Sequence, residues 1–230
     1  GLQFDGIDDY IDCGNDPTLD VFGSNEFTVG AWININQYGY CTIVGHNNAE
    51  NAFHMRVLPD GRIGVYIPGQ SIIRSSSSLS TNTFYHIVYV REGTGAGTSK
   101  IYINGKIDAS GGSDDNFADV PASLLIGIRC TDGLQPFSGT IDDVRIYNRA
   151  LTATEIYQNY NGNVTTKGLI AWWKFDEGNG NIAYDSINTN DGIIVGAGWA
   201  HYGNTGLQFD GIDDYIDCGN DPTLDVFGSN

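Results

Sequence analysis

Carboxylates that could act in pairs are the first residues to consider in this sequence. A retaining glycosidase needs two carboxyl groups roughly 5–5.5 Å apart, on either side of the scissile bond. Adjacent aspartates occur at Asp8–Asp9, Asp114–Asp115 and Asp142–Asp143, but neighbouring residues of a strand point to opposite faces. The glutamates are scattered along the chain, at positions 26, 50, 92, 155 and 177. With no nucleophile, metalloprotease or phosphate-loop signature either, we predict that the protein is not an enzyme.

Loops rich in Asp, Asn and Gly indicate a different chemistry, the binding of calcium. Calcium takes roughly six to eight oxygen ligands, usually gathered from turns. One acidic cluster, Phe4–Pro17, reads FDGIDDYIDCGNDP. In it Asp5-Gly6 is a turn dipeptide, and Asp8 or Asp9 could bond the turn backbone. We therefore favour turn formation over an ion site in this cluster, and predict calcium as the cofactor from the loops as a whole. The four histidines show no spacing typical of metal ligands.

Sugar binding would need a concave patch of aromatic side chains with polar neighbours. Several such residues lie in segments that could reach one face: Tyr38, Tyr40, His46, Asn47, Tyr66, Arg129 and Asp132. An aromatic content of 12% suits the core of a β-sandwich equally well. Trp32, Trp172 and Trp173 fall in expected strands, where we expect at least two of them to be core residues.

The charge balance excludes some classes of partner. The chain carries a formal net charge of −17 at pH 7, which repels nucleic acids and anionic membranes. No apolar run approaches the roughly 20 residues that a membrane-spanning helix needs. We therefore predict no nucleic-acid binding and no membrane insertion.

Cysteines and a sequon add two further predictions. Cys41 begins one expected strand and Cys130 ends another, so a bridge between them is possible if the strands are neighbours. Cys13 would then be free or would link successive units. Asn163-Val164-Thr165 is an N-glycosylation sequon in a segment expected to lie on the surface.

The elements that position these residues are almost all strands. Alternating or β-rich runs with Gly-rich turns every 8–12 residues or so predict an all-β sandwich or barrel. Asn-Gly within Lys100–Asp108 and Asp-Gly within Leu58–Tyr66 predict hairpins. Thr152–Asn159 is the helix candidate, with Thr152 as its cap and Glu155 three residues later. The Ser75–Ser78 and Gly93–Gly97 stretches read as loops. The other expected strands are Glu26–Ile35, Thr42–Val44, Phe53–Val57, His86–Arg91, Leu124–Ile128, Ile141–Tyr147, Leu169–Phe175 and Gly192–Val195.

The same segment of sequence occurs at both ends of the chain. Residues 206–230 match residues 1–25 at every position, which gives a period of 205 residues. Copies that agree in their surface turns as well as their apolar positions are either recent duplicates or an overlap at an engineered boundary. The first alternative predicts a tandem array or polymer longer than this chain.

Several segments together resemble a known family. AWWKFDEGNGNIAYDS (Ala171–Ser186) resembles the opening strand and loop of bacterial laminin-G-like, concanavalin A-like jelly-roll domains. GLQFDGIDDYIDCG is similar to their second segment, FTVGAWI to their third, and FYHIVYV with IYINGK to their central hairpin. GTIDDVRIYNRALTATEI (Gly139–Ile156) is similar to their closing strand and short helix, and is the most specific of these matches. The resemblance implies a jelly-roll β-sandwich with one short helix near residues 152–159.

The resemblance also implies a calcium site. In that family a structural ion commonly ties the opening segment to the closing strand. The matching positions are Asp142 on one side and Asp176, Glu177 and Gly178 on the other. Further candidates are Asn179 and Asp185, with Asp143 as the alternate to Asp142.

The family's order of segments implies a shifted frame. Residues 1–163 would form a sandwich without its opening strands, 164–167 a linker, and 168–230 the opening of the next repeat. The missing strands could come from the preceding repeat of a covalent array, from a separate chain by strand donation, or from residues 168–205 folding back as in a circular permutant. We favour the first two, because a closed permutant would not need residues 206–230.

These inferences predict a non-enzymatic, calcium-stabilised repeat unit of an extracellular filament or surface adhesin, from a microbe. Its partners would be neighbouring copies of itself, with surface glycans as a further possibility. The alternative is a carbohydrate-binding module of a secreted multidomain protein. Saturable binding to glycans would favour the module, and regular filaments without glycan binding would favour the polymer.

Overall fold

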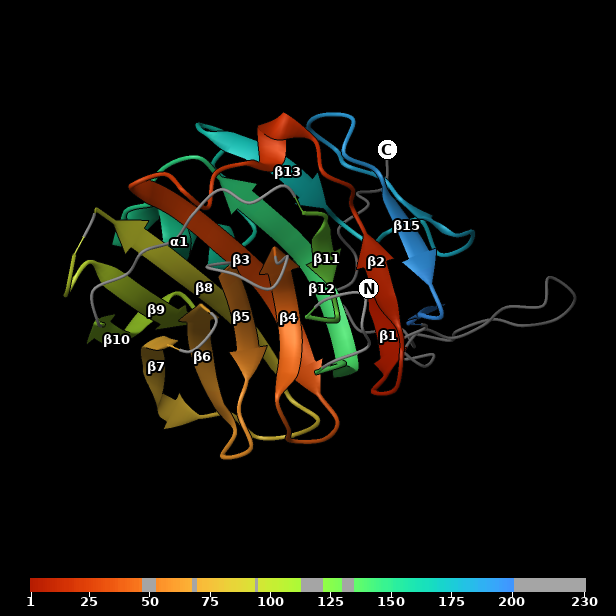
Figure 1. Cartoon of the computed structure of the whole chain (residues 1–230), viewed down its shortest axis with the longest axis horizontal. Coiled ribbons are helices and arrows are strands. Elements are labelled where there is room, and N and C mark those ends of the chain that lie inside the picture. The colour runs from red at the N-terminus through yellow and green to blue at the C-terminus, as the bar shows by residue number, and fades with distance from the viewer. Residues whose placement is uncertain (47–52, 68–69, 94, 113–121, 130–134, 201–230) are drawn as a thin grey trace, which may run out of the picture. The chain divides into compact units, whose positions relative to one another are not determined.

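Two antiparallel sheets face each other in this protein, whose computed structural model describes residues 1–46, 53–67, 70–93, 95–112, 122–129 and 135–200. Strands β1, β13 and β15 alternate buried side chains with partly or fully exposed ones. The strands β3, β4 and β8 are buried along most of their length. Figure 1 shows the two layers, with β4 to β7 in one layer and β3, β8 and β12 in the other. The described residues thus form the all-β sandwich that the sequence predicts.

The first sheet has the order β10-β9-β8-β3-β12-β1-β16, and β13 also pairs with β12. Its strands are β1 (Leu2–Asp5), β3 (Glu26–Ile35), β8 (Phe84–Glu92), β9 (Ser99–Ile103), β10 (Lys106–Gly111), β12 (Ser138–Tyr147), β13 (Leu169–Trp173) and β16 (Gly198–Trp199). The central strands β3 and β12 are the longest, and β3 spans the range predicted from its alternating pattern.

The second sheet has the order β14-β15-β2-β11-β4-β5-β6-β7. Its strands are β2 (Tyr10–Asp12), β4 (Cys41–His46), β5 (Phe53–Val57), β6 (Arg62–Ile67), β7 (Gln70–Ser78), β11 (Leu124–Ile126), β14 (Ile182–Ala183) and β15 (Gly192–Val195). Strands β4 to β7 are consecutive neighbours, so this half of the sheet is a meander whose outward face is built locally.

The core between the sheets is rich in aromatic rings. Phe27 and Phe53 meet edge to face across the layers, with ring centroids 5.5 Å apart, and Phe22 stacks on Phe53 at 4.9 Å. Trp173 is fully buried in the same core. Aromatic side chains bury large areas, and their edge-to-face pairs add stabilisation beyond that burial.

The predicted helix is present as α1 (Ala153–Tyr160). The Thr152 hydroxyl accepts from the Glu155 amide and the Glu155 carboxylate accepts from the Thr152 amide, so the predicted capping box is confirmed. A 3-10 turn, η1 (Pro17–Leu19), follows β2 and is capped by Asp16. No helix within the described residues has the length and apolar character to cross a membrane.

Turn chemistry predicts two hairpins correctly, β5–β6 at Asp60-Gly61 and β9–β10 at Asn104-Gly105, and misses one strand. Asn104 and Gly105 both have positive φ, 50° and 75°, as a two-residue hairpin turn with Asn-Gly requires. The Ser75–Ser78 stretch, predicted as a loop, instead ends β7. There the buried Ser75 hydroxyl accepts from the Ile63 amide at 2.9 Å and donates to the Ser77 carbonyl at 2.7 Å. A side chain that bonds the neighbouring strand makes this polar run compatible with a sheet.

The strands that complete the sandwich come from a different part of the chain than in the favoured prediction. Strand β13 pairs with β12, β15 with β2, and β16 with β1, so Leu169–Trp199 completes both sheets within the same chain. Figure 1 shows β15 beside β2. The described unit is Gly1–Ala200. The fold-back arrangement, which the sequence analysis ranked last, is thus the one in this structure, and its physical reason lies in the connection before β13.

The segment predicted as a linker, residues 164–167, is bound to the closing strand. The Thr165 amide donates to Asn159 Oδ1 at 2.8 Å, and its carbonyl accepts from the Tyr147 hydroxyl at 3.1 Å. The Lys167 carbonyl accepts from Arg149 Nε at 2.8 Å. These bonds hold the chain against α1 and β12 and lead it straight into β13.

Candidate functional site

A seam in the first sheet contains the predicted metal positions. Strands β1 and β13 lie end to end along one side of β12, because Leu2 pairs with Ile141 and Trp173 pairs with Val144. Between these pairs the register of β12 shifts, and Asp143 has a positive φ of 54°. Such a bulge re-aims side chains. We call the residues around this break, Asp142, Asp143, Phe175 and Asp176, the acidic seam.

The Asp142 carboxylate faces a cationic group across this seam. The Gly1 ammonium lies 3.4 Å from Asp142 Oδ1 and donates to the Phe175 carbonyl at 2.6 Å. Burial raises the pKa of Asp142 to about 6, and the charges of Asp143 and Asp176 act in the same direction, against the ammonium. Asp142 Oδ1 is buried and has no hydrogen bond. In any chain that continues before Gly1, this ammonium becomes a neutral amide and Asp142 loses its cationic partner.

The other predicted calcium ligands are engaged in different ways. Glu177 Oε1 accepts from the Tyr184 amide at 2.8 Å, whereas its Oε2 is buried without a partner. Gly178 is a turn residue with φ 70°, and Asn179 donates to the Glu177 carbonyl at 3.5 Å. The Asp185 carboxylate accepts from the Trp172 and Ile187 amides and from Asn190 Nδ2.

The structure therefore brings together part of the predicted set. The charge of Asp176 acts to raise the pKa of Asp142, and Glu177 Oε2 has no hydrogen-bond partner. Asp185 is committed to holding its own loop. The alternate Asp143 accepts from Arg145 and from the Trp172 indole, which leaves it little capacity for an ion.

Three other carboxylates lie closer together than those of the seam. Among the described residues, the ligand atoms of Asp5, Asp8 and Asp9 all lie within 4.8 Å of one another. Asp9 Oδ2 accepts from the Asp5 amide and Asp5 Oδ1 from the Ile7 amide, both at 2.7 Å. These bonds are the turn contacts that the sequence analysis favoured for this cluster.

A second region lies on the outward face of the β4–β7 meander. The guanidinium of Arg56 lies over the Tyr66 ring, with its Cζ 3.7 Å from the centroid of Tyr66 and 4.8 Å from the centroid of Tyr40. Arg74 Cζ lies 5.8 Å from the centroid of Tyr66. The positive charge of Arg129 is close enough to act on the pKa of Arg56, which it lowers. We call Tyr40, Arg56, Tyr66, Arg74 and Arg129 the arginine–tyrosine patch.

Alternation along the strands creates this patch. In β5, Phe53, Met55 and Val57 point into the core, so His54 and Arg56 point outward. Arg56 lies opposite Gly64 of β6, and Gly64 lies opposite Arg74 of β7. A Cβ on Gly64 would lie 2.5 Å from Tyr66 Cε2. The missing side chain thus leaves the room in which the Tyr66 ring lies between the two arginines.

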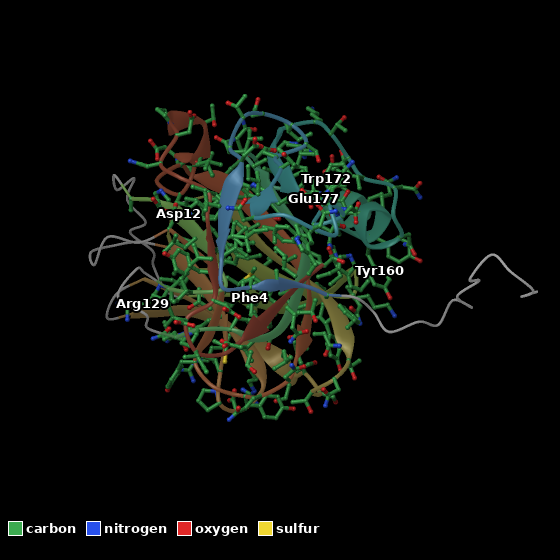
Figure 2. The ribbon with its side chains drawn as sticks, turned by 90° about the vertical axis from the view of Figure 1, so that its right-hand side faces the viewer. Phe4, Asp12, Arg129, Tyr160, Trp172 and Glu177 are labelled. Atoms are coloured by element: carbon green, nitrogen blue, oxygen red, sulfur yellow. The ribbon has the colours of Figure 1, made fainter. Side chains whose placement is uncertain are left out.

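The two regions occupy different sides of the sandwich. Figure 2 shows Trp172 and Glu177, beside the acidic seam, on one side and Arg129 on the other. Burial lowers the pKa of Arg56, and the positive charge of Arg129 acts in the same direction. Arg56 Nη1 donates to Gln135 Oε1 at 2.8 Å, while the Nε atoms of Arg56 and Arg129 are buried without partners.

A family model of the concanavalin A-like lectin/glucanases superfamily, the laminin-G-like type, matches residues 5–157. The chain belongs to this superfamily. This confirms both the family resemblance and the jelly-roll fold that the sequence predicts. No curated protein sequence matches the chain.

Solved structures share this laminin-G-like fold. A candidate carbohydrate-binding protein of Bacteroides ovatus is 24% identical, with a TM-score of 0.62 over 86% of this chain and 59% of that one. The chain thus spans less than two thirds of that protein. The SAP-like pentraxin of Limulus polyphemus, a heptamer, is 16% identical, with a TM-score of 0.54 over 87% and 94% of the two chains. The sialidase module CBM40 of Ruminococcus gnavus, solved with α2,3-sialyllactose, is 14% identical, with a TM-score of 0.52 over 68% and 96%.

The predicted sugar-binding residues separate into groups in this laminin-G-like sandwich. Tyr40, Tyr66 and Arg129 belong to the patch. Tyr38 lies beside Tyr40 in a shallow pocket, and its hydroxyl donates to the Leu79 carbonyl at 2.7 Å. The prediction that His46 binds sugar is wrong, because its side chain points into the core. His46 is 1% exposed and stacks on Phe22, with ring centroids 4.9 Å apart. Asn47 and Asp132 lie outside the described residues.

Sequence reasoning missed Arg56 and Arg74, although each lies on a strand. The signal in the sequence is the alternation FHMRV in the predicted strand Phe53–Val57, which places Arg56 outward. That Arg56 meets Tyr66 and Arg74 depends on strand register, which the sequence alone leaves open. Of the tryptophans, Trp173 is buried, whereas Trp32 and Trp172 are half-buried on the outward face.

The predicted bridge between Cys41 and Cys130 involves a residue that lies outside the described part of the chain, Cys130. Cys41 is a free, buried thiol directed to the Gln37 carbonyl at 3.8 Å. Cys13 is free and buried. Asn163 is exposed, so its side chain is accessible for glycosylation, which stays a prediction.

Proposed function

We propose that this chain is a non-catalytic, extracellular laminin-G-like unit that binds glycans through the arginine–tyrosine patch. The observation that carries the proposal is Tyr40, which is 54% exposed beside Arg56. An exposed ring next to a hydrogen-bond donor offers a sugar both an apolar platform and polar contacts. The Bacteroides protein, a candidate carbohydrate-binding protein, and the Ruminococcus module, solved with α2,3-sialyllactose, are in keeping with this role.

The carboxylates support a binding role over hydrolysis. Glycosidases need one protonated and one ionised carboxyl group facing a common space. Asp142 faces the Gly1 ammonium and Asp143 faces Arg145 and Trp172. Asp60, a described carboxylate beside the patch, is paired with Arg62, whose Nε lies 3.8 Å from Asp60 Oδ2. We therefore propose that a bound glycan is held and not cleaved.

A glycan array followed by titration calorimetry tests the proposal. The chain should bind at least one glycan with saturation, and Tyr40→Ala should lower its affinity by about tenfold or more, since an aromatic anchor in a binding site is worth about 1–3 kcal/mol. Tyr184→Ala is the matched control, because Tyr184 is also 54% exposed but lies outside the patch. Equal losses in both variants, or no binding to any glycan, would contradict the proposal.

A second proposal concerns the repeat, which we take as the sign of an array in an extracellular filament or surface adhesin of a microbe. Residues 1–25 contribute β1, β2 and η1, and bury Leu2, Phe4, Ile11 and Phe22. Residues 206–230 carry the same side chains, so they suit the same position in a further unit. Since the connection at 164–167 is bound within its unit, we propose that successive units join between Ala200 and Gly206.

The mass of denatured, reduced native material tests this second proposal. A very large mass or a ladder with a 205-residue spacing supports tandem units, and a single-repeat mass indicates strand donation between chains. Removing residues 206–230 should leave the melting temperature unchanged if Gly1–Ala200 is the closed unit. A large drop would instead mean that those residues complete the sandwich.

Calcium remains a proposal for the acidic seam. The fit rests on two buried carboxylate oxygens without hydrogen bonds, Asp142 Oδ1 and Glu177 Oε2. The Phe175 carbonyl, beside Asp142, would be a third oxygen ligand of the kind that calcium takes. A bound ion would tie β12 to the start of the loop after β13. Calorimetric titration with calcium chloride should show saturable heat, and its absence would reject the site.

A further inference from the structure

We infer that the arginine–tyrosine patch selects glycans that carry a carboxylate, such as a uronic or sialic acid residue. The inference rests on the proposed glycan binding and adds the class of ligand. Its basis is a set of three guanidinium groups, on Arg56, Arg74 and Arg129, for which the described residues provide no carboxylate partner.

The patch gathers three positive charges on one face of a strongly acidic protein. The chain has 11 basic residues against 28 acidic ones. Elsewhere in the described structure Arg62 pairs with Asp60, Lys100 with Glu92, Arg145 with Asp143 and Arg149 with Glu155. Three like charges gathered on one face repel one another. A carboxylate brought by a ligand would relieve this repulsion.

The guanidinium of Arg56 is held in one orientation before any ligand binds. Its Cζ lies over the Tyr66 ring, 3.7 Å from the centroid, and its Nη1 donates to Gln135 Oε1. A planar guanidinium binds a carboxylate through two parallel hydrogen bonds, and a fixed one loses less side-chain entropy in doing so. Arg74 is exposed beside the same ring, so a second charge is free to approach the ligand.

A shallow pocket next to the arginines offers room for the sugar ring. Tyr40, Leu58, Pro59, Asp60 and Arg74 line it, and its volume is about 220 Å³. Tyr40 provides the stacking surface and Arg74 a positive charge on the wall. Asp60 is the acidic residue at this rim and is 53% exposed, with Arg62 as its partner. Its negative charge should oppose an acidic ligand, which makes it a useful probe.

Pairs of glycans that differ only in charge test the inference. We would titrate the full chain with oligogalacturonate and with its fully methyl-esterified form, and separately with 3′-sialyllactose and lactose. In at least one pair the acidic member should bind about tenfold or more tightly than the neutral one, since a charge-assisted, bidentate contact is lost in the latter. The preference should shrink as salt rises from about 50 to about 500 mM.

Four variants, one of them a control, show whether the arginines cause this preference. Arg74→Gln, at an exposed position, should weaken binding of the acidic glycan more than that of the neutral one, and so remove most of the difference between them. Asp60→Asn should strengthen binding of the acidic glycan. Lys106→Ala is the control, because it also removes one positive charge, at an exposed site on the β9–β10 hairpin. Arg56→Lys keeps the charge but loses the bidentate geometry, and should give an intermediate preference.

The outcomes separate this inference from the proposed function. If neutral and acidic glycans bind equally, glycan binding stands and the inference is overturned. It is overturned as well if Lys106→Ala weakens the acidic ligand as much as Arg74→Gln does, since the effect is then one of net charge. If no glycan binds at all, the proposed function fails and the inference fails with it. Sulfated glycans bound more tightly than carboxylated ones would reject the carboxylate as the preferred group.

Discussion

The acidic seam and the arginine–tyrosine patch are two concentrations of like charge that arise from opposite kinds of contact. At the seam, Gly1 meets Phe175, 174 positions away in the sequence, and segments from both ends of the unit converge on β12. The patch is built mainly on neighbouring strands of one meander, Cys41–Ser78, and Arg129 joins it from the segment after β11. Charge at the seam therefore depends on how the chain closes, whereas charge at the patch depends mainly on the register between neighbouring strands.

The largest expected effect concerns this closure. Trp173 is fully buried in the common core, and its indole donates to the Asn190 carbonyl at 2.8 Å. Trp173→Ala should lower the free energy of unfolding by about 3–5 kcal/mol, as large-to-small core substitutions do. Guanidinium denaturation followed by fluorescence and circular dichroism measures it. If the midpoint is unchanged, residues 168–200 do not belong to the same core.

Arg74→Ala serves as the comparison from the patch. Because Arg74 is exposed, its loss should change stability by less than about 0.5 kcal/mol. An effect similar to that of Trp173→Ala would mean that the patch is also part of the structural core.

Calcium should act on the seam and not on the patch. With free calcium about 100-fold above its dissociation constant, the unit should gain about 2.7 kcal/mol. Asp142→Asn should abolish the rise in melting temperature on adding calcium. Asp8→Asn is the matched control from the other acidic cluster. If the control loses the response and Asp142→Asn keeps it, the ion binds at Asp5, Asp8 and Asp9 instead.

The connection that leads into the seam should respond to acid. Arg149 binds both Glu155 oxygens and the Lys167 carbonyl, and this contact lowers the pKa of Glu155 to about 2. A depressed carboxyl pKa stabilises the fold above the unfolded value of roughly 4.3, and the gain is lost as pH falls toward about 2.

Glu155→Gln should therefore cost about 1 kcal/mol at pH 7, since it removes a partly exposed ion pair and half of a capping box. Chemical denaturation from pH 7 to pH 2 should show the difference from the parent chain shrinking across that window. A difference that stays constant down to pH 2 would mean that the ionised carboxylate is not the stabilising group.

The smallest effect on stability is expected at the patch. Tyr40→Ala removes a ring that is 54% exposed, and should change the melting temperature by no more than about 2 °C while it weakens glycan binding. A large loss of stability would show that Tyr40 holds β4 in place. Tyr40 and Trp173 would then differ only in how much each contributes to the stability of the fold.

Local chemistry was readable from the sequence. The alternation of Glu26–Ile35 predicted β3, Asn104-Gly105 predicted the hairpin turn, and Thr152 with Glu155 predicted the capping box. Each of these features depends on residues a few positions apart, whose backbone and capping preferences are similar in most folds. The wrong predictions depended on more distant partners. Ser75 belongs to a strand because its hydroxyl bonds β6, and His46 is buried because β4 turns that side inward.

The sequence by itself determined an all-β sandwich or barrel and a 205-residue period, because strand periodicity, turn motifs and identical segments can be recognised without the fold. Its segments also resembled the laminin-G-like family, which the family model confirms. Only the tertiary structure decided which strands complete the sandwich and which charges meet. Pairing of β13, β15 and β16 within the same chain, and the meeting of Arg56 with Tyr66, depend on register between strands. Shifting a register by one residue turns every side chain to the other face, so residue types alone could not place them.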